Sequence, residues 1–326
     1  MLLFIGCQSP MTELDLPDEI DEAQVTLTIE NAVTRSFNTT TAEAWEKKVN
    51  TATIYTYQAS TGKLIYAYPL KSTEITALNN ASSSTISFLL PVTGSQNYNF
   101  YLVANTTPSA SVSTESSLLT SIEQDIALYN GTYDNITTKA LRTNGFVMTG
   151  SAQGILLSNG GNSMINITLR RIVAKMGIEI NISALLTLGT SVVTDVSLTQ
   201  CAAVSNLFPL VTANPAGTVI TLTQTAKQDA TNNRKFRAFF YVYENNASSV
   251  STNQVKLTFK VVNTLLVSTT YTYSVYITGD SNGKIIRNRG YYIVANVNKL
   301  INILFSVQPA SSSWGVLKEQ AYELQF

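Results

Sequence analysis

The sequence contains no histidine. Histidine is the side chain best suited to proton transfer near neutral pH and the commonest ligand of transition metals, so two large classes of catalytic site lack their usual residue. Cysteine is almost as scarce, with only Cys7 and Cys201, which excludes a cysteine-rich zinc site. The few acids of the body form no pair in an aromatic setting typical of a glycosidase. We therefore expect no enzymatic activity, no cofactor and no metal.

Charged residues are also few, at 13% of the 326 residues, and the formal net charge is zero. No dense stripe of lysine and arginine with interleaved aromatic residues occurs, so nucleic acid is not an expected partner. Neither a transmembrane helix nor an internal repeat is evident. The chain is instead 44% hydrophobic, with 16 tyrosines and 12 phenylalanines, a composition that suits half-buried sheets better than long helices. The sequence predicts an all-β protein with room for two domains.

Apolar and polar residues alternate in the segment 23–31, where Val25, Leu27 and Ile29 fall on one side and mostly threonine falls on the other. This is the pattern of a strand with one buried face. Many similar short runs separated by turns indicate sandwiches or barrels. We predict further strands at 53–57, 64–68, 85–89, 98–104, 165–169, 172–182, 192–198, 219–222, 236–243, 255–262, 270–277, 291–296 and 300–307.

Two segments rich in Gly and Asn, 159–162 and 279–283, predict hairpin turns because both residue types tolerate positive φ. One stretch, 116–128, has apolar residues at helical spacing and predicts a short covering helix or turn. Strand sets of similar size lie on either side of residue 170, so we place the domain boundary near that position.

The first residues, 1–7, form a short apolar run that ends in Gly6 and Cys7. This resembles the end of a bacterial lipoprotein signal, in which a small residue precedes the cysteine that receives the lipid. The apolar part is short and has no basic residue before it, so we expect the natural signal to start upstream of Met1. The alternative is an incidental apolar start with an unmodified Cys7. If Cys7 is lipidated, Cys201 has no disulfide partner, and we expect it to be a small buried residue.

An acidic leader, 8–35, follows the apolar run, and its first part contains two prolines. Such a composition predicts an extended, solvated tether that holds the folded body away from the bilayer. Arg35 is the first basic residue of the chain and is followed by Ser36 in a polar segment with little apolar content to bury. A protease therefore has access there at low unfolding cost.

At the other end of the chain, apolar residues alternate again after Trp314, with Val316, Tyr322, Leu324 and Phe326 on one face. A strand of this kind with no partner in its own domain is an aggregation hazard unless another subunit takes it. The alternative is that this final strand packs within its own chain.

Several segments carry a family resemblance when they are taken in order. They are Cys7 with the acidic leader, the isolated arginine of Thr34-Arg35-Ser36, the run 98–105 that ends in Val-Ala-Asn, Phe146-Val147-Met148-Thr149-Gly150, the Leu-Arg-Arg-Ile-Val-Ala-Lys run at 169–175, Ile286-Arg287-Asn288 with Tyr291-Tyr292, and the closing Trp314 segment. Together they resemble the type V pilins, the major and minor fimbrillins of Bacteroidia, over nearly the whole chain.

The resemblance implies two tandem transthyretin-like β-sandwich domains, 36–170 and 171–326, with a cleavable N-terminal strand and a donor-strand tail at 314–326. It also implies an outer-membrane lipoprotein precursor that an arginine-specific protease cuts between Arg35 and Ser36. Cleavage displaces the strand with Val25, Leu27 and Ile29, and donor-strand exchange with other pilin subunits then builds a cell-surface fimbrium for adhesion. The alternative function is a surface lipoprotein that binds a glycan or a host ligand without polymerising.

Overall fold

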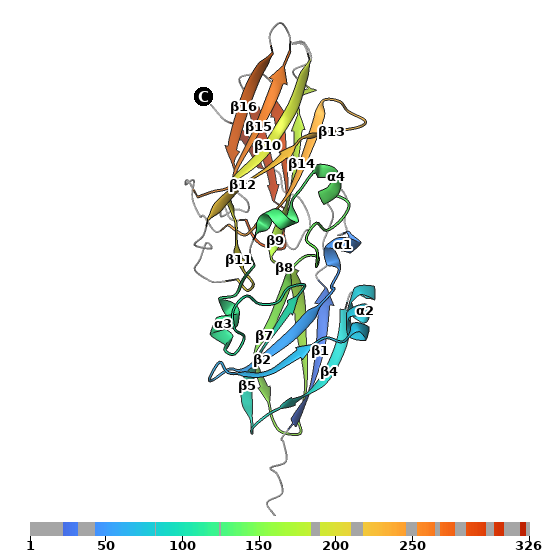
Figure 1. Cartoon of the computed structure of the whole chain (residues 1–326), viewed down its shortest axis with the longest axis vertical. Coiled ribbons are helices and arrows are strands. Elements are labelled where there is room, and N and C mark those ends of the chain that lie inside the picture. The colour runs from blue at the N-terminus through green and yellow to red at the C-terminus, as the bar shows by residue number, and fades with distance from the viewer. Residues whose placement is uncertain are drawn as a thin grey trace, which may run out of the picture.

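The computed structural model describes residues 22–31, 43–81, 83–123, 125–183, 190–209, 218–245, 253–264, 268–277, 285–297, 303–309 and 320–323. The molecule is elongated, with two groups of strands stacked along its long axis and short helices near their junction (Figure 1). The protein is predominantly β, as the composition predicts. No helix within these ranges is long and apolar enough to cross a membrane.

The first group of strands is a seven-stranded sheet with the order β3-β2-β5-β7-β8-β1-β4. Because β7 and β8 pair only through Met148 with Arg171 and Thr149 with Arg170, the sheet divides there into two layers. The N-terminal core lies between them, with side chains from all seven strands. The strands are β1 (Glu22–Asn31), β2 (Ala52–Gln58), β3 (Leu64–Pro69), β4 (Ser83–Pro91), β5 (Gln96–Ala104), β7 (Met148–Leu157) and β8 (Asn162–Arg171).

Two glycines in this part have a definite structural reason. A Cβ on Gly150 would lie 2.6 Å from both the Thr168 backbone oxygen and the Ile167 Cγ2 atom, so only glycine allows β7 and β8 to approach so closely. Gly160 has a φ of +66° and lies in the turn between β7 and β8. This segment is a turn, as predicted, but not a tight hairpin, because the two strands do not pair next to it. The second predicted hairpin, 279–283, lies outside the described residues.

The second group of strands forms a four-stranded sheet, β12-β10-β15-β16, and a six-stranded sheet, β13-β14-β9-β17-β18-β19. Cys201 in β10 is 1% exposed, which agrees with its predicted role as a small core residue. The strands are β9 (Val173–Asn181), β10 (Ser191–Ala202), β12 (Val219–Thr225), β13 (Lys227–Gln228), β14 (Lys235–Tyr243), β15 (Lys256–Asn263), β16 (Thr269–Tyr276), β17 (Gly290–Val297), β18 (Ile303–Pro309) and β19 (Gln320–Glu323).

The strand arrangement of the first group is repeated in the second, although the sequence shows no repeat. Strand β1 pairs antiparallel with β4 and parallel with β8, and β9 likewise pairs antiparallel with β14 and parallel with β17. The order β3-β2-β5-β7 also corresponds to β12-β10-β15-β16. Strand β9 therefore occupies in the second group the position that β1 occupies in the first.

The segment 116–128, predicted as a short covering helix or turn, forms three short elements and no continuous helix. Asp125 adopts a left-handed φ of 58°, and Glu123 turns inward to an ion pair with Arg142 at 2.7 Å. The elements are α3 (Glu115–Leu119), β6 (Ile122–Glu123) and η1 (Ile126–Tyr129), and α4 (Tyr133–Ile136) follows them. Three further elements were not predicted: β7, α1 (Ala44–Lys47) and α2 (Ser72–Asn80).

The two groups of strands share an apolar cluster that runs from the outer face of β2 and β5 into the second group. Tyr101 meets Phe208 edge-on at a centroid distance of 4.9 Å, and Phe146 meets Tyr241 at 4.7 Å. Strand β6 also pairs with β11 (Ser205–Asn206). The junction is therefore packed like a protein interior rather than joined by a free linker.

Candidate functional site

Strand β1 lies inside its sheet, with a partner on each edge (Figure 1). Residues Glu22 to Glu30 pair antiparallel with β4, and Gln24 to Asn31 pair parallel with β8. Among the described strands, β1 is the only one that pairs with β4. A strand that precedes the rest of its domain in sequence thus holds two neighbours together.

The inner face of β1 is fully buried. Ala23, Val25, Leu27 and Ile29 are each 0% exposed, whereas the outward Thr26 hydroxyl lies 3.1 Å from the Ser87 hydroxyl. The inward face predicted from the alternation is confirmed. If each of the three larger side chains contributes about 1.5–3 kcal/mol, their burial stabilises the fold by about 5–9 kcal/mol.

Removing β1 would therefore leave a groove with two features. Its floor would be apolar, because the side chains that face β1 belong to the N-terminal core. Its sides would be the backbones of β4 and β8, each with a row of unsatisfied N–H and C=O groups. We call this site the β1 groove.

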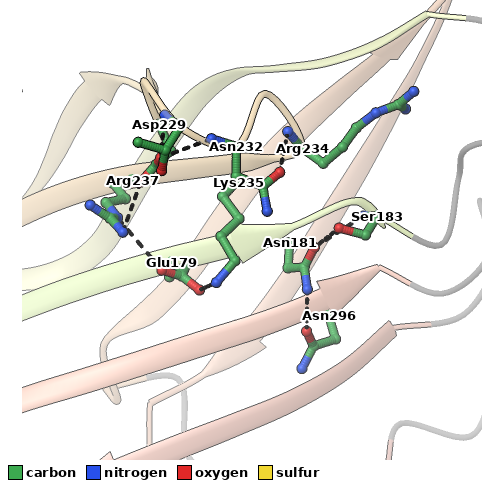
Figure 2. Close-up of polar contacts among 10 residues, drawn as sticks. Glu179, Asn181, Ser183, Asp229, Asn232, Arg234, Lys235, Arg237 and Asn296 are labelled. Atoms are coloured by element: carbon green, nitrogen blue, oxygen red, sulfur yellow. Dashed lines mark hydrogen bonds and ion pairs between the residues drawn. The ribbon is translucent and has the colours of Figure 1, made fainter.

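The strand in the equivalent position of the second group is held differently. The Glu179 carboxylate of β9 accepts a hydrogen bond from Lys235 at 2.8 Å and pairs with Arg237, which also pairs with Asp229 at 2.8 Å (Figure 2). At the end of β9 the Asn181 amide donates to the Asn296 side chain (Figure 2). Strand β9 also lies between β8 and β10 in the chain. A single cut would therefore leave it covalently attached at one end.

The other predicted site residues fall mostly beyond the described part of the chain. Cys7, Arg35 and Ser36 lie outside the described residues, as do Trp314, Val316, Leu324 and Phe326. The remaining one, Tyr322, is placed in β19, where it is the register partner of Phe305 in β18. The residues Gln320–Glu323 thus pair within their own chain, which is the arrangement that the sequence left open as the alternative to donation.

A second feature of the structure is a buried polar cluster between the two groups of strands, which we call the junction cluster. Glu46 of α1 is 1% exposed and accepts hydrogen bonds from the Lys175 ammonium and the Tyr241 hydroxyl, both at 2.6 Å. The Arg171 Nε donates to the Glu46 backbone oxygen at 2.6 Å, and its backbone N–H donates to Asn288.

The electrostatics of the cluster favour an ionised Glu46. Burial alone would raise its pKa, but the charges of Lys175 and Arg171 and the hydrogen bonds from Lys175 and Tyr241 outweigh burial, so the pKa of Glu46 is lowered. A buried carboxylate needs this kind of compensation because its desolvation is costly. The cluster is therefore a compensated ion network rather than a proton-transfer site.

Three of the motifs that carry the family resemblance meet at this junction. Arg171 and Lys175 come from the 169–175 run, Asn288 follows Arg287, and Phe146 packs on Trp45 at 5.9 Å. Sequence reasoning placed none of them there and missed Glu46 entirely. Glu46 stands next to Trp45 in a short stretch that shows neither helical nor strand periodicity, so no local pattern pointed to it.

Comparisons with known proteins agree with this architecture. The chain is similar to a putative cell adhesion protein from Parabacteroides distasonis, with 13% identity, a TM-score of 0.60, and 93% of this chain and 97% of that one covered. It is similar to a fimbrilin from Porphyromonas gingivalis, with 15% identity, a TM-score of 0.56, and coverage of 85% and 90%. It is also similar to the C-terminally truncated tip fimbrial protein Mfa3 of that organism, with 14% identity, a TM-score of 0.55, and coverage of 93% and 100%. A search of curated proteins finds no match.

The family model described as major fimbrial subunit protein (FimA) matches residues 23–199. This match covers more than half of the 326 residues and includes β1, the strands of its groove and the junction cluster up to Lys175. The chain therefore belongs to the major fimbrial subunit protein (FimA) family, and it is a structural subunit of a cell-surface fimbrium with other pilin subunits as partners, not an enzyme.

Proposed function

We propose that this fimbrial subunit is exported as a lipoprotein with its lipid on Cys7 and that it polymerises by protease-triggered donor-strand exchange. An arginine-specific protease cuts between Arg35 and Ser36, β1 leaves, and the tail of a neighbouring subunit takes its place. The mature chain then consists of two domains, 36–170 and 171–326.

The observation that carries the proposal is the position of β1. Its last residue, Asn31, comes shortly before Arg35 in sequence, so a cut after Arg35 leaves β1 attached to the body by non-covalent contacts alone. Those contacts are two ladders and one apolar face. A strand held in this way can be replaced by another strand of the same pattern, and the open groove strongly favours such a replacement.

The tail 314–326 supplies a strand of that pattern, with Val316, Tyr322, Leu324 and Phe326 at alternating positions. In the single chain Gln320–Glu323 pairs with β18, so donation requires this segment to exchange β18 for the β1 groove of a neighbour. The contact joins different surfaces of two subunits and does not close on itself, which produces a filament rather than a ring.

The full chain treated with an arginine-specific protease tests the proposal on a denaturing gel run without boiling. The wild type should lose residues 8–35 and give a ladder of polymers, whereas Arg35→Ala should give neither. Leu324→Asp should be cut normally and polymerise poorly, because it places a charge at an inward position. Gln325→Asp, on the opposite face of the same segment, is the matched control and should polymerise like the wild type. A ladder of equal strength for both tail variants would contradict the donor assignment.

The lipid is tested separately by metabolic labelling with a fatty acid. The wild-type precursor should take up label and Cys7→Ala should not, because Cys7 is the only cysteine that follows an apolar segment with a small residue before it. Continued labelling of the variant would rule out Cys7 as the lipid site.

A further inference from the structure

The segment between the proposed cut and β2 is tied down by the junction cluster. Helix α1 (Ala44–Lys47) comes after Arg35 and before β2 (Ala52–Gln58) in sequence. It is only four residues long, too short to be stable by itself. Its position must therefore come from its contacts with the rest of the protein.

Those contacts are made by elements that stay in the mature chain. The Glu46 side chain accepts from Lys175 in β9 and Tyr241 in β14, and its backbone oxygen accepts from Arg171 at the end of β8. The second carboxylate oxygen of Glu46 accepts from the backbone N–H of Glu43 at 3.1 Å. The buried Glu46 side chain thus fixes both α1 and Glu43, the residue just before the helix.

The residues after α1 are held in the same manner by two asparagine side chains. Asn105 accepts from the backbone N–H of Asn50 at 2.7 Å and donates to the backbone oxygen of Lys48 at 2.8 Å. Asn79 of α2 accepts from Val49 N–H at 2.8 Å and donates to the Val49 oxygen at 2.7 Å. The backbone from Lys48 to Asn50 is therefore bonded to side chains of other elements before β2 begins.

Strand β1 is held through other hydrogen bonds among the described residues, although its apolar face shares the N-terminal core with Val49. Its hydrogen bonds go to β4, to β8 and to the turn at Gly160 and Gly161, and its side chains lie in the N-terminal core. The two sets of contacts flank the proposed cut: one holds the strand that leaves, and the other holds the chain that remains.

We propose that the Glu46 junction cluster is an anchor for the new N-terminal end of the mature subunit, so that loss of β1 opens the groove without loosening β2. This inference rests on the proposed function for its role, since it is the cut at Arg35 that makes an anchor necessary. Without the anchor, the new chain end would fray into β2, which pairs with both β3 and β5, and the groove would lose part of its opposite wall.

Hydrogen exchange measured by mass spectrometry on the full chain tests the anchor. In the wild type, the peptides covering 45–52 and 22–31 should both be protected. In Glu46→Gln, exchange in 45–52 should be at least tenfold faster while exchange in 22–31 changes less than twofold. Tyr241→Phe, which removes a single hydrogen bond to Glu46, should give a smaller acceleration of the same peptide and serves if Glu46→Gln does not fold.

Glu244→Gln is the matched control, because Glu244 is another nearly buried carboxylate, paired with Arg287. It should leave exchange in 45–52 at the wild-type rate. After arginine-specific cleavage, wild-type 45–52 should keep its protection although β1 has been lost. The anchor is overturned if Glu46→Gln exchanges like the wild type, if Glu244→Gln accelerates 45–52 equally, or if the cut wild type loses protection there. A chain that is not cut at all refutes the proposed function, while the measurement on the intact chain still decides the anchor.

Discussion

Replacing Leu27 by alanine tests how firmly β1 is held and through which face. The Leu27 side chain is 0% exposed and lies in the N-terminal core. Its register partners are Ile86 in β4 and Ile165 in β8. Truncating a buried leucine typically costs about 2–5 kcal/mol, because apolar contact is lost and a cavity remains. Thr28→Ala changes the neighbouring outward residue, and such a change costs about 0.5 kcal/mol or less.

Two assays measure the consequence. Urea unfolding of the intact chain should show the free energy of unfolding of Leu27→Ala reduced by at least about 2 kcal/mol. In the chain cut after Arg35, the same loss acts on a strand that is no longer covalently attached. A weakening of about 2 kcal/mol corresponds to roughly a thirtyfold weaker hold, so the released leader should appear in size-exclusion fractions at least about ten times sooner than in the wild type.

The comparison between the two variants gives the refutation. If Leu27→Ala and Thr28→Ala release the leader at the same rate, the buried face does not hold β1. If Leu27→Ala destabilises the intact chain but leaves release unchanged, β1 does not leave by breaking its core contacts. Either result contradicts the groove as described.

Three further predictions concern residues away from β1. Thr56 is fully buried and its hydroxyl has no hydrogen-bond partner among the described residues, so Thr56→Val should raise the free energy of unfolding in urea by about 1 kcal/mol; a loss of stability would show that the hydroxyl is satisfied. Gly150→Ala should lower the free energy of unfolding by about 1–3 kcal/mol, because its Cβ would overpack the close contact of β7 with β8, and an unchanged melting temperature would contradict this close approach. Burial raises the pKa of the Cys201 thiol to about 12, so a thiol reagent at pH 8 should label Cys201 in urea but not in the folded protein; rapid labelling of the folded protein would show that the site is open.

Sequence reasoning succeeded where one local pattern decides the outcome. The alternation around Leu27 identifies β1 and its buried face, because a strand with one buried side has a period of two. The Gly and Asn residues at 159–162 identify a turn for an equally local reason. Most other strands were placed correctly, although their ends differ by a few residues.

Sequence reasoning failed where distant residues decide the outcome. The apolar spacing at 116–128 is helical, but Glu123 pairs with Arg142 and Ile122 pairs in register with Asn206, and these contacts end the helix. No local pattern identifies Glu46, because its hydrogen-bond partners Lys175 and Tyr241 are far away in sequence. The repeated strand order is hidden for the same reason: pairing between distant strands defines it, and similar residues do not.

The central claim is that a neighbour's tail replaces β1 in the filament, and a cryo-electron microscopy reconstruction of filaments assembled from the cut chain tests it most directly. The account predicts that the strand between β4 and β8 is the tail 314–326 of the adjacent subunit, with the side chains of Tyr322, Leu324 and Phe326 directed into the core that Leu27 occupied. A reconstruction in which the subunit's own residues 22–31 still lie between β4 and β8 would contradict it.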